Sequence, residues 1–335
     1  MALLGASKHR PTKEHNCIVG AVSRSVEPPL NMSPRKKLIV TGANGFVAGS
    51  ILAQGADAWE IHAVSRGTGP DPQGEWKAHS LDSLARDPWA ELFRDVRPAA
   101  VIHTAALADI DYCEAHPDLA REVNFGLTRT LANLCAEHGA RLVHCSTDTI
   151  FDGEHAPYRE QDPPGPVNVY AHTKVAAEHA VLDASAGHVV ARLAVIVGLP
   201  VLGVGNSFVA RMLASLEAGR VVTVPEAEIR TPIDVVTLGK ALMELASNEA
   251  TSGVFHLAGN DRLNRLELAR RIAVFFGHDP AGVVGIDPTT LPGRAARPRD
   301  VSMDNAKARA HLGTPMVGLD AALTSIRQTS QRRRP

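Results

Sequence analysis

One stretch near the start of the sequence restricts the fold more than any other. Residues 37–40 (KLIV) form a short apolar run typical of a buried strand, and it leads directly into the glycine-rich segment at residues 41–49. The order of strand, glycine-rich turn and helix lets the backbone approach a pyrophosphate while the helix N-terminus faces its negative charge. A tight turn without a ligand is the alternative. We predict that a dinucleotide contacts Gly42, Asn44, Gly45, Phe46 and Val47.

A second strand is predicted at residues 60–64, and it ends at Ser65 and Arg66. In a dinucleotide-binding fold this position meets the adenosine ribose, where an acidic residue would accept from the 2′-hydroxyl of NAD. Arg66 would instead pair with a 2′-phosphate, unless it is an ordinary solvated loop residue. Ser65 and Arg66 are therefore assigned to the cofactor, with NADP(H) favoured and NAD(H) still admitted.

Strands and helices continue to alternate along the chain. Further buried strands are predicted at residues 99–103 and 141–145, and helical spacing of apolar residues covers 83–95 and 111–137, with a break near Pro117. Short connections between alternating elements indicate an α/β fold with a doubly wound parallel sheet, which is Rossmann-like. Ligands bind such a sheet beyond the carboxyl ends of its strands. The residues expected there, beside the cofactor, are Thr104, Ala105, Ala106, Leu107 and Ser146.

Three residue types suited to proton transfer occur close together in the sequence. Tyr170 and Lys174 are four residues apart, so on a helix they lie on the same face, and Thr147 follows the strand at residues 141–145. An ammonium group near a phenol favours the phenolate and lowers the phenol pKa toward the working range. A Tyr and a Lys at this spacing also occur by chance on solvated helices. We predict Thr147, Tyr170 and Lys174 as catalytic residues, and we predict that Tyr170 and Lys174 also contact the cofactor.

Composition narrows the class of partner. The net charge is −1 and aromatic residues make up 4% of the chain, so neither a nucleic acid nor a membrane surface is expected as a partner. The four cysteines lack the spacing of a zinc site, and no metal is predicted. Residues 1–35 show no sustained periodicity and are predicted to be a disordered leader, without the layout of a signal peptide. We expect a cytoplasmic protein.

With these motifs in place, the chain resembles the extended short-chain dehydrogenase/reductase superfamily, and within it the dTDP-4-dehydrorhamnose reductase branch. The resemblance runs from about residue 36 to residue 320, and its motifs occur in the order and spacing of the family. The matching stretches are residues 41–49 (TGANGFVAG), 103–106 (HTAA), 111–114 (DYCE), 123–124 (VN), 146–153 (STDTIFDG), 157–160 (PYRE) and 168–174 (NVYAHTK).

The resemblance implies an NAD(P)H-dependent reductase that acts on a nucleotide-linked 4-keto-deoxy sugar. Tyr170 would donate the proton, and Asn124 would support Lys174 through water. A cofactor domain would span residues 36–190, and a smaller substrate lobe would span residues 191–325, with segments returning to the main domain. The resemblance assigns the nucleotide sugar to Asp148, Arg230 and Arg297, and each arginine could equally form a surface salt bridge. A homodimer is compatible with the family.

Two other functions stay open at this point. A non-catalytic NADP-binding subunit, similar to the regulatory β subunit of methionine adenosyltransferase, would share the fold and the cofactor pocket. A nucleotide-sugar epimerase or dehydratase belongs to the same superfamily, although a dehydratase usually has an acidic pair where this chain has Asp148 alone. Val195 and Thr149 stand where the rhamnose reductases usually carry aromatic residues, which leaves the sugar undetermined.

Overall fold

The computed structural model describes residues 34–70, 75–202, 206–290 and 293–332. The predicted leader, residues 1–35, lies outside these ranges except for Pro34 and Arg35. The helices and strands belong to the compact unit that begins at Arg35.

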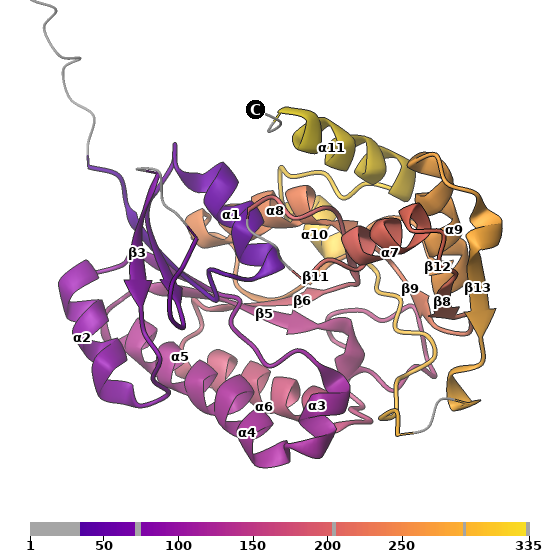
Figure 1. Cartoon of the computed structure of the whole chain (residues 1–335). Coiled ribbons are helices and arrows are strands. Elements are labelled where there is room, and N and C mark those ends of the chain that lie inside the picture. The colour runs from indigo at the N-terminus through magenta and orange to yellow at the C-terminus, as the bar shows by residue number, and fades with distance from the viewer. Residues whose placement is uncertain (1–33, 71–74, 203–205, 291–292, 333–335) are drawn as a thin grey trace, which may run out of the picture. The chain divides into compact units, whose positions relative to one another are not determined.

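A seven-stranded sheet forms the centre of this unit, and all of its strands run parallel (Figure 1). The spatial order is β11-β6-β5-β4-β1-β2-β3, so the chain builds one half outward from β1 to β3 and then crosses over to build the other half. This is the order of a doubly wound α/β fold, and it confirms the predicted fold class. The strands are β1 (Lys37–Thr41), β2 (Glu60–Ser65), β3 (Trp76–Ser80), β4 (Ala100–His103), β5 (Arg141–Thr147), β6 (Val189–Leu193) and β11 (Gly253–Leu257).

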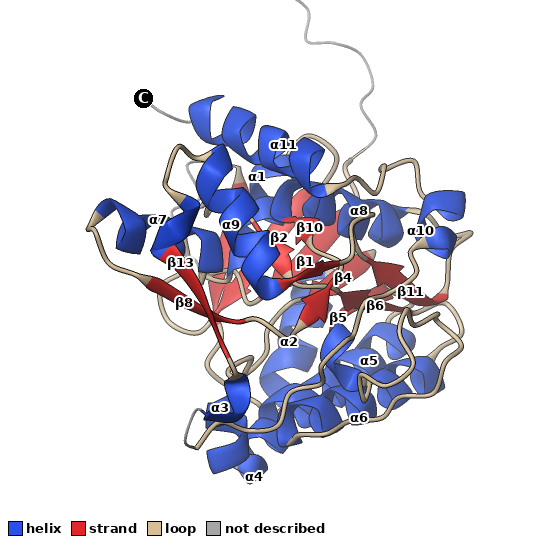
Figure 2. Cartoon of the chain, turned by 90° about the vertical axis from the view of Figure 1, so that its right-hand side faces the viewer, coloured by secondary structure: helices blue, strands red, loops and turns tan. Residues whose placement is uncertain are grey.

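Helices cover both faces of the sheet, as Figure 2 shows. One face is covered by α1 (Phe46–Gly55), α8 (Val235–Ser247) and α10 (Ala306–His311). The other is covered by α2 (Arg86–Val96), α5 (Leu127–Glu137) and α6 (Val169–Ala184). The helical stretch predicted at 111–137 is divided as expected, because Pro117 cannot continue a helix. Its parts are α3 (Ile110–Ala115), α4 (Pro117–Arg121), a π-helical segment (Glu122–Gly126) and α5.

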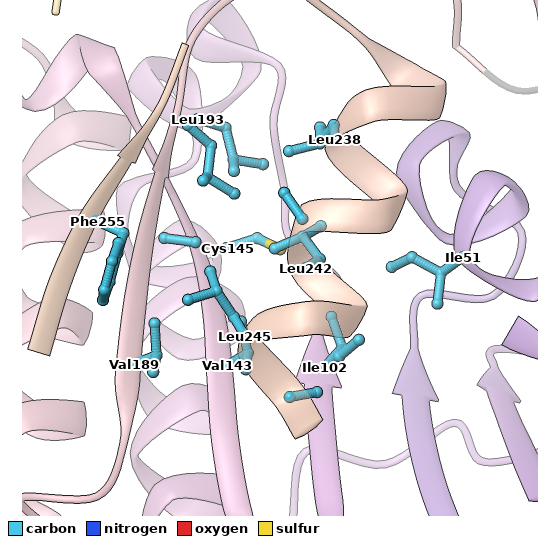
Figure 3. Close-up of a cluster of buried hydrophobic side chains, with 14 of the residues drawn as sticks. Ile51, Ile102, Val143, Cys145, Val189, Leu193, Leu238, Leu242, Leu245 and Phe255 are labelled. Atoms are coloured by element: carbon cyan, nitrogen blue, oxygen red, sulfur yellow. The ribbon is translucent and has the colours of Figure 1, made fainter. Parts of the chain in front are cut away.

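The apolar spacing of α8 explains how the larger core is built. Leu238, Leu242 and Leu245 recur every three or four residues, so they share one side of the helix and pack onto the sheet. Figure 3 shows this row of side chains between strand residues such as Val143 and helix α1, from which Ile51 projects. The strands are apolar on both faces because helices cover both. This packing fixes where each strand ends, and therefore where the site residues lie.

The C-terminal third of the chain contains a second apolar core, built from short elements. Three two-stranded sheets pair β7 (Ile196–Val197) with β10 (Ile233–Asp234), β8 (Val222–Pro225) with β13 (Val283–Ile286), and β9 (Ile229–Arg230) with β12 (Leu263–Asn264). The helices are α7 (Phe208–Glu217), α9 (Arg265–Phe275) and α11 (Leu319–Arg332). Short 3-10 turns occupy Asp148–Ile150, Pro280–Gly282 and Pro288–Thr290. The boundary predicted between residues 190 and 191 falls inside β6, and β11 returns to the main sheet.

Candidate active site

The sheet reverses its winding direction between β1 and β4, and a crevice opens there at the carboxyl ends of the strands. Gly42, directly after β1, has a φ of 70°, which side-chain-bearing residues rarely adopt. A Cβ atom at Gly42 would lie 2.9 Å from the Cα of Ala105, directly beyond β4. Thr104 Oγ1 also donates to the Thr41 carbonyl over 2.7 Å. The two predicted cofactor segments therefore touch, and glycine is required where they meet.

A cavity of about 720 Å³ lies at this crevice. It contains most of the predicted cofactor residues, namely Gly42, Asn44, Gly45, Ser65, Arg66, Thr104, Ala105 and Ala106. The wall also includes residues that the sequence reasoning missed, among them Leu81, Asp82, Ser83, Leu84, Trp89 and Leu119. Phe46, Val47, Leu107, Asn124 and Ser146 do not line this cavity. The structure thus groups the residues predicted for one half of a dinucleotide.

The cavity suits a group that carries phosphate. Helix α1 begins beside it, and its N-cap residue Gly45 makes no side-chain hydrogen bond to the first turn. The first turn of α1 also contains no acidic residue, so its backbone N–H groups face the cavity without a competing carboxylate. Arg66 is exposed at the same cavity, and Asn44 donates to the Thr68 carbonyl over 3.1 Å, which joins the glycine-rich turn to the loop after β2. A dinucleotide with phosphate groups fits this donor set.

The predicted catalytic residues lie where α6 meets the end of β5. Helix α6 begins at Val169 because Asn168 Oδ1 accepts from the Ala171 backbone N–H over 2.8 Å. Tyr170 is buried in the first turn, and Lys174 is buried one turn later. The ammonium of Lys174 donates to the carbonyl of Cys145 over 2.7 Å, which ties the helix to the strand that ends at Thr147.

The pKa of the Tyr170 phenol is shifted in the direction opposite to that predicted from the sequence. Lys174 was expected to lower the pKa of the phenol, but burial raises that pKa above its usual range, and the hydrogen bond with Thr147 opposes the rise. The charge of Asp148 raises the pKa further. The reason is geometric, because the Lys174 ammonium is directed at Cys145 and His144. The phenol therefore stays protonated at neutral pH and holds a proton that it can donate.

Lys174 belongs to a network of buried polar groups. Burial lowers the pKa of its ammonium to about 8. Asn124 donates to Thr173, the residue before Lys174, over 3.1 Å, and its Oδ1 accepts from the Leu107 backbone N–H over 2.8 Å. Asn124 therefore connects the turn that carries Lys174 to the loop after β4. The support of Lys174 by Asn124 through water stays a prediction.

Two of the predicted substrate residues lie together. Arg230 Nε is 3.9 Å from Asp148 Oδ2, and both side chains are buried. Among the described residues, that Asp148 oxygen has no hydrogen-bond partner. Burial raises the pKa of Asp148 to about 6, although Arg230 acts in the opposite direction. Because Asp148 directly follows Thr147, a buried acceptor lies next to the catalytic residues.

Arg297, the third predicted substrate residue, is held in an ion pair. Its guanidinium donates to both carboxylate oxygens of Asp111, over 2.6 and 2.8 Å. The side chain of Arg297 is 12% exposed and that of Asp111 is 48% exposed, so the pair lies at the protein surface. Two further arginines were missed by the sequence reasoning: Arg265, whose charge acts on Asp148, and Arg294, which pairs with Glu228. Nothing in their sequence context distinguished them from solvated arginines.

Ser146 was predicted to contact the cofactor, but its hydroxyl donates to Glu178 on α6. Glu178 in turn pairs with Arg192 of β6 over 2.9 Å, and both side chains are buried. The side chain of Ser146 therefore belongs to the contact between helix and sheet.

The described residues show neither a metal-binding cluster nor a membrane-spanning helix. They contain no group of three or more His, Cys, Asp or Glu side chains placed to hold a metal ion. No helix within the described ranges is long and apolar enough to cross a membrane.

Comparison with known proteins identifies the family of the chain. Residues 36–331 match the family described as RmlD substrate binding domain. The dTDP-4-dehydrorhamnose reductase of Mycobacterium tuberculosis strain H37Rv is 33% identical over 270 residues, which cover 78% of this chain and 83% of that protein. The methionine adenosyltransferase 2 subunit beta of Bos taurus is 30% identical over 287 residues, which cover 84% of each chain.

The fold is shared with a solved structure of the same type. The dTDP-4-dehydrorhamnose reductase of Bacillus anthracis, in complex with NADP, superimposes with a TM-score of 0.77 at 23% identity. The likeness covers 88% of this chain and 99% of that one.

Proposed function

Because this chain belongs to the RmlD substrate binding domain family, we propose that it reduces the keto group of a nucleotide-linked 4-keto-deoxy sugar. The chain is an NAD(P)-dependent oxidoreductase of the extended short-chain dehydrogenase/reductase type. The observation that carries the proposal is the grouping of Thr147, Tyr170 and Lys174 at the end of β5. The carboxyl end of β5 lies on the same side of the sheet as the carboxyl ends of β1 and β4, where the dinucleotide cavity is.

The cofactor is NADP(H) in preference to NAD(H). Arg66 supports this choice because a guanidinium binds a 2′-phosphate through paired hydrogen bonds, and Ser65 beside it offers a hydroxyl. The N-terminus of α1 would hold the pyrophosphate, and the small residues Ala105 and Ala106 would let the cofactor lie against the backbone. When bound in its reduced form, the nicotinamide supplies the hydride.

The chain's own residues supply the proton. Tyr170 keeps its phenol protonated because it is buried, and it would give that proton to the carbonyl oxygen of the substrate. Thr147 hydrogen-bonds the phenol and would orient the same carbonyl. Lys174 would hold the cofactor ribose. With the hydride from the reduced cofactor, the products would be a secondary alcohol, the oxidised cofactor and a phenolate that solvent must reprotonate.

The substrate end is built from Asp148 and Arg230. The free oxygen of Asp148 can accept from a sugar hydroxyl, since it is buried without a partner among the described residues. Arg230 is held between Asp148 and Glu228 and can turn toward a diphosphate, a role that Arg297 would share if it left Asp111. Besides the cofactor, we propose the nucleotide sugar as the partner needed for turnover.

A direct test is incubation of the protein with NADPH and a panel of nucleotide-linked 4-keto-6-deoxy sugars, with cofactor absorbance as the readout. Loss of absorbance with at least one sugar, and formation of the matching alcohol, are expected. A protein that binds NADPH but consumes none with any sugar would contradict the proposal.

The second candidate is a non-catalytic subunit. It is favoured by the 30% identity to methionine adenosyltransferase 2 subunit beta over most of both chains. The two candidates differ in one measurement, because a regulatory subunit would bind NADPH without turnover and would change the kinetics of an adenosyltransferase added to it. The buried set of Thr147, Tyr170 and Lys174 supports the reductase.

A further inference from the structure

A buried histidine that the reaction does not use lies next to the catalytic lysine. His144 is on β5, and its side chain is fully buried. Its Nε2 is 3.1 Å from Nζ of Lys174, while the same ammonium donates to the carbonyl of Cys145 over 2.7 Å. Two of the three N–H groups of Lys174 thus have partners on β5.

The chemistry of the two side chains fixes the direction of this hydrogen bond. An ammonium can only donate, so Nε2 of His144 must accept, and a neutral imidazole then carries its proton on Nδ1. Burial and the charge of Lys174 both lower the pKa of His144 well below its ordinary value, so the ring is neutral at pH 7. Nδ1 has no hydrogen-bond partner among the described residues.

Because Nδ1 has no hydrogen-bond partner among the described residues, His144 destabilises the core relative to an apolar side chain. A buried N–H group without a partner costs roughly 1–3 kcal/mol, whereas an apolar side chain would fill the same space without that penalty. Within the part of the chain that the structure describes, the ring has one hydrogen-bond partner, Lys174. We propose that His144 is a positioning residue, which holds the Lys174 ammonium by accepting from it and directs the remaining N–H toward the cofactor ribose.

The other charged and titratable groups around this pair come from several elements. His103 on β4 lies opposite His144 in the strand register, with the ring centroids 5.5 Å apart, and Nδ1 of His103 is 2.7 Å from Thr41 Oγ1. Cys145 on β5 and Glu178 on α6 raise the pKa of Lys174, while burial lowers it. None of these groups takes the place of His144 as a side-chain acceptor for the ammonium in the described structure.

The first test reads the tautomer in the intact parent protein. Labelling with ¹⁵N-histidine and recording long-range ¹H–¹⁵N correlations near pH 7 should show His144 with a protonated Nδ1 and an unprotonated Nε2. The resonance is assigned by its loss in His144→Gln. A proton on Nε2 would overturn the proposal, and this readout is independent of any substrate.

The second test measures NADPH affinity in two variants. His144→Phe removes the acceptor, so affinity at pH 7.5 should fall roughly 10-fold, in keeping with the loss of one hydrogen bond to a charged group. In both proteins NADPH affinity should fall as pH rises and Lys174 loses its proton. In His144→Phe this fall should begin at a lower pH than in the parent, because the ammonium without its acceptor loses its proton more easily. His144→Gln places an amide oxygen near the position of Nε2 and should restore most of the affinity and the parent pH profile.

A matched control separates positioning from packing. His188 is also buried, directly before β6, and its Nε2 is 3.2 Å from the Ala132 carbonyl. His188→Phe should lower the melting temperature without changing the pH dependence of NADPH binding. A folded His144→Phe protein with parent affinity, or a His144→Gln protein as weak as His144→Phe, would overturn the proposal.

The inference rests on the proposed function only through the contact of Lys174 with the cofactor. If the parent protein fails to bind NADPH, the proposed function fails, and the tautomer measurement still decides the role of His144. If NADPH binds and no sugar is reduced, the affinity series decides it.

Discussion

Asp148 and Arg230 form a buried pair that is longer than a hydrogen bond, with Asp148 Oδ2 and Arg230 Nε 3.9 Å apart. Arg230 has a second carboxylate within 3.3 Å, that of Glu228, so Asp148 is the less well compensated member. The effect of burial on the pKa of Asp148 therefore outweighs that of Arg230, and the pKa rises to about 6. The site keeps a carboxyl group that is costly to ionise, in a place where a sugar hydroxyl could donate to it.

This relationship predicts a stability cost that depends on pH. The folded pKa of Asp148 is about 6, against 3.8 as the ordinary value. The folded state favours the protonated form of Asp148. Its contribution to stability is therefore complete at a pH below the ordinary pKa, and it is lost as the pH rises through the folded pKa. Asp148→Asn should therefore be more stable than the parent at pH 8, by up to about 3 kcal/mol, and the difference should shrink toward pH 4.

Denaturant titration of both proteins between pH 4 and pH 8 would measure this difference. Asp183→Asn, at an exposed position on α6, is the matched control, and its difference from the parent should stay constant across this range. A constant difference between parent and Asp148→Asn across the pH range would contradict the prediction.

Tyr170→Phe should retain NADPH affinity and lose turnover by roughly 10²- to 10⁴-fold, since proton donation by a positioned group contributes that much. The ring remains to fill the buried site, so the melting temperature should change little. Tyr112→Phe, on the exposed part of α3, is the matched control and should behave as the parent. Parent-like rates in Tyr170→Phe would show that another group donates the proton.

Arg66→Ala should narrow the preference for NADPH over NADH by roughly 1–3 kcal/mol, the value of a hydrogen bond between charged groups. The two dissociation constants should be measured by titration in the same buffer, because ionic strength screens this exposed charge. Arg94→Ala, on the exposed side of α2, keeps the net charge equal to that of Arg66→Ala and should leave the preference unchanged. Equal affinities of the parent for both cofactors would remove the basis for this assignment.

The buried pair of Glu178 and Arg192 should matter far more than exposed pairs. Glu178→Gln leaves the guanidinium of Arg192 without its carboxylate in the protein interior, which should cost about 3–5 kcal/mol of unfolding free energy. Glu137→Gln removes the partner of Arg86 at the surface, where both side chains are half exposed, and should cost less than about 1 kcal/mol. Similar losses in the two variants would show that Arg192 finds other partners.

The sequence predicted the repeating part of the fold because apolar runs and helical spacing mark buried elements directly. It did not predict β3, since Trp76 is the buried residue of a strand whose other side chains are mainly exposed. Without β3, the loop that follows it could not be assigned to the crevice, and Asp82 and Ser83 were missed as cavity residues.

At the active site, residue types and spacing identified Tyr170 and Lys174, but sequence could not give the direction of the lysine side chain. That direction depends on which acceptors β5 presents to α6, and these are the Cys145 carbonyl and His144. Likewise, the sequence suggested that the Ser146 hydroxyl could contact the cofactor, but this hydroxyl donates to Glu178, 32 positions later in the chain. Contacts between distant segments, which local spacing does not encode, decide such details.

The place of β11 in the sheet bears on how the chain can be made and divided. Its partner β6 ends at Leu193, yet β11 begins only at Gly253, after much of the second core has been synthesised. During synthesis, β6 must therefore wait with one backbone edge unpaired, and such edges invite aggregation. A fragment that ends near residue 190 would keep this exposed edge permanently. Because β11 pairs with β6 only late in synthesis, we expect the nascent chain to need chaperones. We also expect the isolated N-terminal half to be insoluble.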